Sequence, residues 1–301
     1  MILLRLLAAA VSVLPAEVAE AAGGVAGWVW YYVLPVRRRV ALENVRRALG
    51  PTDAPRICRA NFVHLMRILL DFLRAVGGGF RSLRGKIRVT GWDRVERARA
   101  AGRGVLIISG HVGSFDLIVP ALGERGLKVH ILTKHAKAQS LDRFWQQSRE
   151  RLGVSMLPRR DAVWKILKAL RRGEGIGIMI DQHQGGNAPI VQFFGRPAST
   201  TDAPAIFAER TGAPVLPVYL RRLSEGRHLL EVGEDLGFER ISQDRAENLR
   251  HNVQRYSLDL ESAIRRFPEQ WFWVHRRWKA ERRLQASAPA ATGHQPSARA
   301  Q

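Results

Sequence analysis

The chain has 301 residues, 46% of them hydrophobic, which is enough for one large domain or two small ones with a packed core. Its 48 Lys and Arg residues against 27 Asp and Glu give a formal net charge of +21, so an anionic partner is expected: nucleic acid, an anionic membrane surface, a phosphorylated substrate or an acidic protein. The single cysteine, Cys58, excludes an intrachain disulfide and is typical of a reducing compartment.

Two apolar segments, residues 6–14 and 25–34, lie near the start of the chain. Each is shorter than the roughly 18 to 20 residues that a membrane-spanning helix requires. Joined through Pro15, they predict a membrane-associated anchor over residues 1–36, as an interfacial helix or a broken hydrophobic hairpin. A signal peptide is the alternative, because residues 19–21 resemble a small-x-small cleavage site.

Aromatic and basic residues occur together in two places, at residues 28–39 and 270–279. Rings at headgroup depth and arginines beside lipid phosphates are typical of membrane interfaces, although the same residue types stack on single-stranded nucleic acid. The apolar N-terminal segments favour the membrane. The expected interface consists of Trp28, Trp30, Arg37, Arg38, Trp271, Trp273, Arg276 and Arg277.

The rest of the chain predicts one α/β domain over residues 37–284, with a central, mostly parallel sheet flanked by helices. Residues 37–76 have a helical apolar stripe, and residues 285–301 are expected to be a disordered tail. Predicted strands are 87–89, 105–109, 129–133, 155–157, 176–180, 191–194, 215–220 and 228–232. Predicted helices are 92–101, 115–123, 141–152, 162–170, 202–211 and 242–267.

The strand at residues 105–109 leads into a glycine-bounded turn that holds His111 and, five residues later, Asp116. If His111 folds back over the first turn of the next helix, Asp116 can hold one ring nitrogen and leave the other free to accept a proton. N–H groups at the start of that helix would then stabilise an anion. Ser114 lacks the first glycine of a G-x-S-x-G nucleophile elbow, because position 112 is Val, so a His general base is favoured over a nucleophilic serine.

Other polar clusters follow predicted strands, where ligands bind in parallel α/β sheets. Two arginines after residue 157 are suited to hold phosphate or an oxyanion, with a solvated loop as the alternative. The histidines fit no tight metal-ligand spacing, so no metal is expected. The expected substrate-binding or oxyanion-binding residues are Arg159, Arg160, Asp181, Gln182, Phe194, Gly195 and Arg196.

Five motifs occur in a fixed order along the chain: an H-x4-D box at 111–116, Asp-Gln at 181–182, F-F-G at 193–195, T-G-A-P-V-L-P at 211–217 and P-E-Q-W-F-W-V-H-R-R-W-K at 268–279. Over roughly residues 1–280 this order resembles the bacterial lipid A biosynthesis acyltransferase family, the late lauroyl and myristoyl transferases of the glycerolipid-acyltransferase-like superfamily.

The resemblance implies an enzyme that transfers a fatty acyl chain from a thioester of acyl carrier protein or CoA. The acceptor would be a hydroxyl of a lipid A precursor or related glycolipid, at the cytoplasmic face of the bacterial inner membrane. His111 is then the expected general base, Asp116 orients it, and helix N–H groups with Arg159 stabilise the oxyanion. The expected partners are the lipid acceptor, the thioester donor and an anionic membrane surface, with no cofactor and no nucleic acid.

Asp116 leaves the acceptor open, because many lipid A members carry Glu at this position. Relatives that acylate phosphatidylinositol mannosides from acyl-CoA carry Asp there, so that lipid or another phospholipid is the alternative acceptor. A non-catalytic basic protein that binds lipid or nucleic acid is a third hypothesis.

Overall fold

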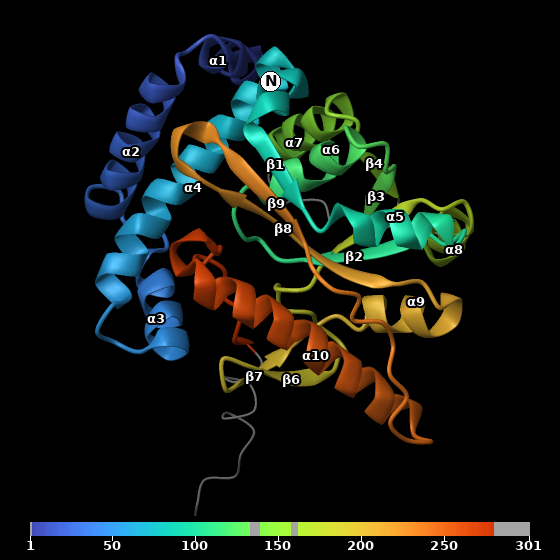
Figure 1. Ribbon diagram of the computed structural model, residues 1–301. Helices are drawn as coiled ribbons and strands as arrows, with labels where there is room; N and C mark the ends of the chain where they lie inside the picture. The colour runs from blue at the N-terminus through green and yellow to red at the C-terminus, as the bar shows by residue number, and fades with distance from the viewer. Residues whose placement is uncertain (1, 133–138, 158–161, 280–301) are drawn as a thin grey trace, which may run out of the picture.

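The computed structural model describes residues 2–132, 139–157 and 162–279, and a seven-stranded sheet lies at its centre (Figure 1). The strand order is β1-β9-β8-β2-β5-β3-β4, with β8 and β9 antiparallel and the other neighbours parallel. A separate antiparallel hairpin joins β6 and β7. The strands are β1 (Ile87–Thr90), β2 (Val105–Ser109), β3 (Val129–Leu132), β4 (Ser155–Leu157), β5 (Gly175–Met179), β6 (Ile190–Phe193), β7 (Arg196–Ser199), β8 (Val215–Arg222) and β9 (His228–Val232).

Helices precede the sheet in the sequence and then alternate with its strands. The first group is α1 (Ile2–Ser12), α2 (Ala16–Tyr32), α3 (Arg38–Leu49), α4 (Ala54–Gly78) and the 3-10 helix η1 (Phe80–Lys86). The second is α5 (Trp92–Ala100), η2 (Phe115–Leu117), α6 (Ile118–Gly123), α7 (Gln139–Arg151), α8 (Ala162–Arg171), α9 (Ala203–Thr211), η3 (Ser224–Gly226), α10 (Arg245–Arg266) and η4 (Pro268–Gln270). This order confirms the predicted α/β class with a mostly parallel sheet flanked by helices.

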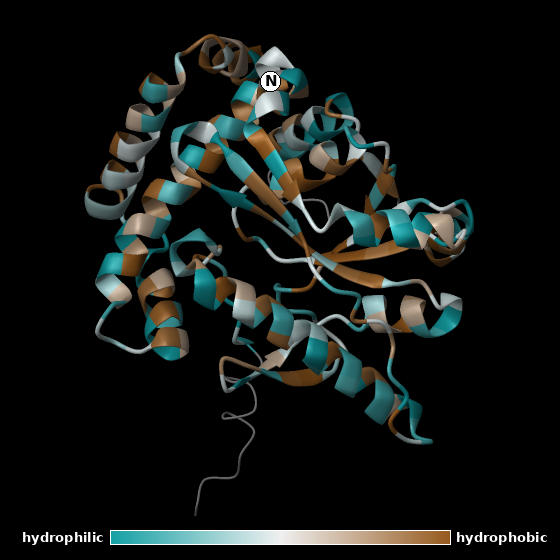
Figure 2. Ribbon diagram, in the orientation of Figure 1, coloured by the Kyte–Doolittle hydropathy of each residue, from teal (hydrophilic) through white to brown (hydrophobic). Residues whose placement is uncertain are grey.

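The sheet is covered on both faces, as its continuous apolar strands require. All five side chains of β2 are buried. Leu106 and Ile108 belong to the core shared with α8, α9 and α10, whereas Val105 and Ile107 belong to the core shared with α5 and α6. Figure 2 shows these central strands as a hydrophobic layer between helices of mixed character. Buried on both sides, β2 is a rigid support for the turn that follows it.

The N-terminal helices pack along α4, and α2 does so through small side chains. A Cβ added to Gly27 would lie 2.4 Å from Val63 Cα, so only glycine permits this approach of the two helices. Ala19 and Gly23 are also buried, while larger apolar side chains of α2 face solvent. None of the helices within the described ranges combines the length and the apolar character needed to cross a membrane.

Several predicted boundaries differ from the structure. The helical pattern of residues 37–76 is two helices, because Gly50 and Pro51 interrupt it between α3 and α4. The hairpin strand β7 was not predicted, and the segment 115–123 begins as a 3-10 turn rather than an α-helix. The expected tail, residues 285–301, lies outside the described residues.

Candidate functional site

His111 and Asp181 lie side by side because they follow two neighbouring parallel strands. Ser109 is opposite Met179 in the register of β2 and β5, so the residues two positions further on come level at the carboxyl edge of the sheet. His111 Nδ1 is 2.8 Å from Asp181 Oδ1, and the backbone N–H of His111 donates to Asp181 Oδ2 at 2.7 Å. The side chain of Asp181 is 3% exposed and that of His111 17%. The pair is a buried carboxylate that holds a partly accessible imidazole.

The turn that carries His111 is held by its own backbone. Gly113 has φ 61°, and a Cβ there would lie 2.1 Å from Leu220 O, so this position requires glycine. Its N–H donates to Gln270 O at 2.9 Å, and the N–H of Ser114 donates to Leu220 O at 2.8 Å. These bonds fix the turn between β8 and the C-terminal segment.

The two members of the pair shift each other's pKa values. Burial alone would lower the pKa of His111, but the charge and hydrogen bond of Asp181 outweigh it and leave the pKa above its ordinary value. Burial alone would raise the pKa of Asp181, but the charge of His111 and hydrogen bonds from His111 and Trp271 hold it well below the ordinary range. Asp181 is therefore ionised, and Nδ1 of neutral His111 is the donor to it. Nε2 is left as the basic nitrogen.

Asp116 does not hold a ring nitrogen of His111, which corrects the predicted pairing. Its carboxylate accepts two hydrogen bonds from Arg149, at 3.0 and 2.6 Å, and one from Trp145 Nε1 at 3.1 Å. The 3-10 turn η2 directs Asp116 toward α7, which carries both donors. The charge of Asp116 still contributes to the raised pKa of His111. Arg149 was missed because a charged helix such as α7 gives no sequence signal for one particular arginine.

The predicted aromatic interface is wrong at its C-terminal end. Trp271, Trp273 and Arg277 are 2%, 0% and 1% exposed, so none of them can contact a lipid surface. Trp271 Nε1 donates to Asp181 Oδ2 at 2.8 Å, and Trp273 Nε1 donates to Pro268 O at 2.6 Å. Their indole N–H groups have acceptors within the chain, which is why the rings can be buried.

Arg277 supports the other side of the site. Its guanidinium donates to Ser199 O at 2.5 Å, to Gln182 O at 3.2 Å and to Thr200 Oγ1 at 2.5 Å. Burial lowers its pKa to about 10, so Arg277 stays protonated at neutral pH. It ties the residues after β5 to those after β7. Arg276, its neighbour, is exposed as predicted.

A pocket of about 460 Å³ opens over the His111 ring. Gln182 is at its rim and donates from Nε2 to His111 Nε2 at 3.3 Å. Arg149 and Asp116 line the same pocket, together with apolar side chains of β2, β3, β5 and α6. The pocket therefore places a base, an amide donor and a cation around one space.

A second, almost wholly apolar slot of about 190 Å³ lies beside this pocket. Phe115 and Asp116 line both cavities, so the two adjoin at the turn after His111. The slot is bounded by α4, by Trp30 of α2, and by Trp145 and Phe272. A narrow apolar cavity next to a base is suited to a hydrocarbon chain.

The remaining predicted site residues are spread over the molecule. Arg159 and Arg160 lie outside the described residues. Phe194, Gly195 and Arg196 belong to the turn and start of the β6–β7 hairpin and are not among the described residues that line the pocket at His111. At the N-terminal end, Trp28 and Arg37 are exposed, whereas Trp30 and Arg38 are half-buried.

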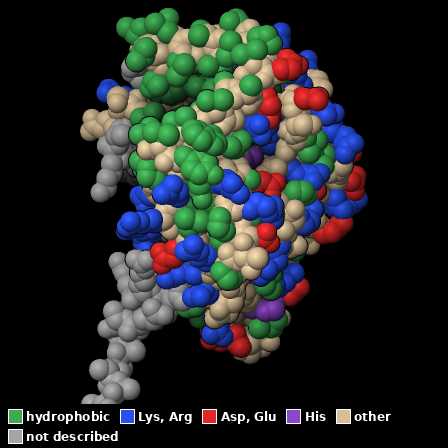
Figure 3. Space-filling view, turned by 90° about the vertical axis from the view of Figure 1, so that its left-hand side faces the viewer, with side chains coloured by type: hydrophobic (Ala, Val, Ile, Leu, Met, Phe, Trp, Pro, Cys, Tyr) green, Lys and Arg blue, Asp and Glu red, His purple; other side chains and the backbone are tan. Residues whose placement is uncertain are grey.

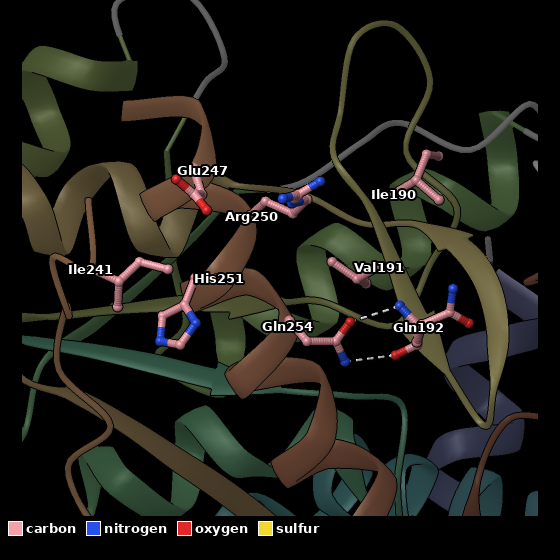
Figure 4. A pocket seen from close by; sticks show the side chains of 8 residues that line it. All are labelled: Ile190, Val191, Gln192, Ile241, Glu247, Arg250, His251 and Gln254. Carbon is pink, nitrogen blue, oxygen red and sulfur yellow. Dashed lines mark hydrogen bonds between the residues drawn. The ribbon is translucent and has the colours of Figure 1, made fainter. Parts of the chain in front are cut away.

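Another pocket, of about 360 Å³, lies between β6 and α10 (Figure 4). Gln254 extends from α10 and pairs through its side-chain amide with the backbone N–H and C=O of Gln192, at 2.7 and 2.8 Å. Its histidine, His251, is paired with Glu239. This pocket shares no lining residue with the pocket at His111, and the amide pairing covers the edge of β6.

Comparison with known proteins places this site in a family. The chain is 24% identical over 186 residues to a lipid A biosynthesis acyltransferase of Haemophilus influenzae (61% of this chain, 56% of the relative). It is 27% identical over 199 residues to the lipid A biosynthesis palmitoleoyltransferase of Escherichia coli (64% and 61%). It is 28% identical over 187 residues to a phosphatidylinositol mannoside acyltransferase of Mycobacterium tuberculosis (59% of each). The chain thus aligns with less than two thirds of these relatives' length.

The family model for bacterial lipid A biosynthesis acyltransferases matches residues 2–280. This range contains the described sheet, the His111–Asp181 pair and both cavities beside it. The match covers far more than half of the sequence. The chain therefore belongs to the bacterial lipid A biosynthesis acyltransferase family.

Proposed function

We propose that this protein is a membrane-associated O-acyltransferase that moves a fatty acyl chain from a thioester to a hydroxyl of a glycolipid. The observation that carries the proposal is the geometry of His111, whose Nδ1 is held by buried Asp181 while Nε2 faces a pocket beside an apolar slot. Membership of the acyltransferase family supports the same reaction class. The donor is an acyl carrier protein or CoA thioester, and the protein itself supplies the acid–base groups.

In the proposed reaction, His111 Nε2 takes the proton of the acceptor hydroxyl as the oxygen bonds to the thioester carbonyl carbon. Asp181 stabilises the imidazolium that results, since its carboxylate already accepts from Nδ1. The carbon–sulfur bond then breaks, and the imidazolium returns the proton to the departing thiolate. No covalent acyl-enzyme is needed.

The tetrahedral intermediate carries a negative oxygen, and Gln182 is the proposed donor to it. Its Nε2 lies 3.3 Å from His111 Nε2, so a hydroxyl that displaces this contact leaves the amide N–H beside the reacting carbon. Arg149 adds positive potential in the same pocket while Asp116 fixes its orientation. Asp116 thus contributes by holding Arg149 in place and by the effect of its negative charge on His111. It does not orient the imidazole.

The acyl chain is assigned to the apolar slot. Its walls are Leu65, Met66, Leu69 and Phe72 of α4 with Trp145 and Phe272, a lining with almost no polar surface. A fatty chain gains roughly 0.8 kcal/mol for each methylene group that it buries. A chain seated there would have its thioester near Phe115, which contacts the His111 ring with centroids 4.7 Å apart.

Membrane association is proposed from the outer face of α1 and α2. Large apolar side chains are exposed on it, including Leu3 at 77%, Leu6 at 62%, Val25 at 65% and Trp28 at 56%. Figure 3 shows that hydrophobic side chains gather in the upper part of this side of the molecule and that Lys and Arg side chains lie below them. An apolar patch with a basic border suits the cytoplasmic face of an anionic inner membrane.

A lipid A precursor is the proposed acceptor, and a phosphatidylinositol mannoside is the second candidate. Both classes occur among the relatives, at 24% to 28% identity, so sequence similarity does not separate them. Both carry phosphate, which matches the positive charge of the chain.

The test is acyl transfer from acyl carrier protein and CoA thioesters to each acceptor in vesicles, measured for the wild type and for His111→Ala. We expect the substitution to lower kcat roughly 10²- to 10⁴-fold, because the base is lost. His251→Ala is the matched control, since His251 is half-buried and lines only the distant pocket. Undiminished transfer by His111→Ala would contradict the general-base role, and a wild type inactive on both acceptors would contradict the function.

A further inference from the structure

The C-terminal segment, residues 270–277, is bonded to the turn that holds the base. Gly113 N–H donates to Gln270 O, and Phe272 N–H donates to His111 O at 3.0 Å. Trp271 stands between these two bonds, in an antiparallel bridge to Val112. A residue fixed at this point is fixed relative to His111.

The backbone of this segment is held from its other side by buried amides of the N-terminal helices. Asn61 of α4 donates to Glu269 O at 2.8 Å and to Trp271 O at 2.6 Å, and Asn44 of α3 donates to Trp273 O at 2.7 Å. Asn61 is 0% exposed and Asn44 6%. These side chains contribute to the position of Trp271 without contacting the pair at the site.

The indole of Trp271 completes the set of donors around Asp181. Oδ1 accepts from the His111 ring, whereas Oδ2 accepts from the His111 backbone and from Trp271 Nε1 at 2.8 Å. A carboxylate held at one oxygen can still rotate about its Cβ–Cγ bond. Two donors on Oδ2 leave Oδ1 directed at the imidazole.

The ring itself has little freedom to move. It lies 4.5 Å from Trp273, 5.6 Å from Phe193 and 6.2 Å from Trp278, centroid to centroid. Trp271 is 2% exposed and is not among the described residues that line the pocket or the apolar slot. Among the side chains of the described residues, Asp181 is the hydrogen-bond acceptor of its indole N–H.

We propose that Trp271 is a positioning residue of the acyl-transfer site, acting through Asp181 to hold the His111 imidazole in the tautomer and orientation that leave Nε2 basic. It does not touch substrate. The proposed role goes beyond packing, because it depends on the indole N–H. A phenyl ring would fill most of the same space but has no such donor.

The kinetic test compares Trp271→Phe with Trp273→Phe, a matched control that loses an indole N–H in the same buried cluster but has no bond to Asp181. We expect Trp271→Phe to lower kcat by about tenfold or more and to change KM by less than about twofold. Trp273→Phe should keep kcat near the wild-type value once both proteins are shown to be folded. Equal kcat values for the two variants would overturn the proposal.

A second measurement needs neither substrate nor a folded variant. In the wild-type protein labelled with ¹⁵N at tryptophan and histidine, the Nε1–H resonance of Trp271 should titrate with the same midpoint as the His111 ring, because bonded groups polarise one another. The Nε1–H resonance of Trp273 should not follow that midpoint. A Trp271 resonance unaffected by the ionisation of His111 would overturn the proposal, whatever the kinetics.

The kinetic arm rests on the proposed function, and the NMR arm does not. If the wild type transfers no acyl chain but Trp271 titrates with His111, the proposed function fails and the positioning role stands. If transfer occurs but Trp271 neither titrates with His111 nor affects kcat, the positioning role fails alone.

Discussion

The two aromatic and basic regions of this chain, residues 28–39 and 270–279, differ in how far their tryptophan side chains are exposed. Near the N-terminus, Trp28 is 56% exposed on α2, and Arg37 follows it at the surface. Near residue 270, Trp271 and Trp273 are almost completely buried. In the second region both buried indole N–H groups have acceptors, Asp181 for Trp271 and Pro268 O for Trp273. Composition describes both stretches alike, but only the fold supplies those acceptors.

The largest effect on activity should come from removing the negative charge of Asp181, which both Trp271 and His111 contact. In Asp181→Asn the side-chain amide can donate to Nδ1, which favours the tautomer with the proton on Nε2 and removes the base. We expect kcat to fall roughly 10²- to 10⁴-fold, as measured by initial rates of acyl transfer. The pH profile separates this effect from a packing defect.

In the wild type, activity should rise with pH through the raised pKa of His111, because the neutral imidazole is the base. Without the charge of Asp181, the effect of burial on the His111 pKa is no longer outweighed, so the midpoint of this limb should move to lower pH. The pH dependence of stability has the opposite sign. The raised pKa of His111 stabilises the fold at pH values below the pKa of this side chain in the unfolded chain, and the contribution is lost as the pH rises through its pKa in the folded protein. A midpoint unchanged in the variant would contradict the pairing.

Substitution of the buried Arg277 tests whether the region near residue 270 also stabilises the fold. Arg277→Met removes three hydrogen bonds to oxygen atoms of the interior, so we expect a loss of about 2 to 4 kcal/mol in the free energy of unfolding. Urea denaturation measures it. Arg276→Met, at the exposed neighbouring position, should change the same quantity by less than about 0.5 kcal/mol. Similar losses for the two variants would show that the buried bonds contribute little.

The smallest effect is expected in the exposed region. Trp28→Ala should reduce partition into phosphatidylethanolamine–phosphatidylglycerol vesicles roughly threefold to tenfold, because one ring no longer inserts between headgroups. Sedimentation with the vesicles measures it. Trp164→Ala is the control, since Trp164 is 61% exposed on α8, outside the α1–α2 face. If both substitutions lower partition equally, the proposed membrane face is wrong.

The sequence was sufficient to predict the central sheet and the place of His111 after β2. It gave the wrong partner for His111, because spacing along the chain was used in place of the register between strands. Both His111 and Asp181 were predicted to follow strands, but the second strand was predicted to end at residue 180. Only the observed end of β5 at Met179 puts the two residues at equal distances from their strand ends. Asp116 was preferred because it is near in sequence, yet η2 directs it to Arg149. Proximity along the chain is a weak guide when a turn reverses direction.

Other contacts had no signal in the sequence at all. The bond from Trp271 to Asp181 joins residues 90 positions apart, and no periodicity or motif predicts which indole meets which carboxylate. The small side chains of α2 were visible, but their packing against α4 required the structure. The family resemblance predicted the class of reaction, which the family match supports. It did not predict the partner of the base.

The bridge between Val112 and Trp271 also has a consequence for synthesis of the protein on the ribosome. His111 and Asp181 are translated before the C-terminal segment that bonds to the His111 turn. That segment emerges about 160 residues after His111, and closing so long a loop is slow because the contact is non-local. Strand β1 must likewise wait for β9, its only neighbour in the described sheet. A nascent chain that stops short of residue 270 therefore carries the histidine and the carboxylate without the backbone and indole bonds that complete the site.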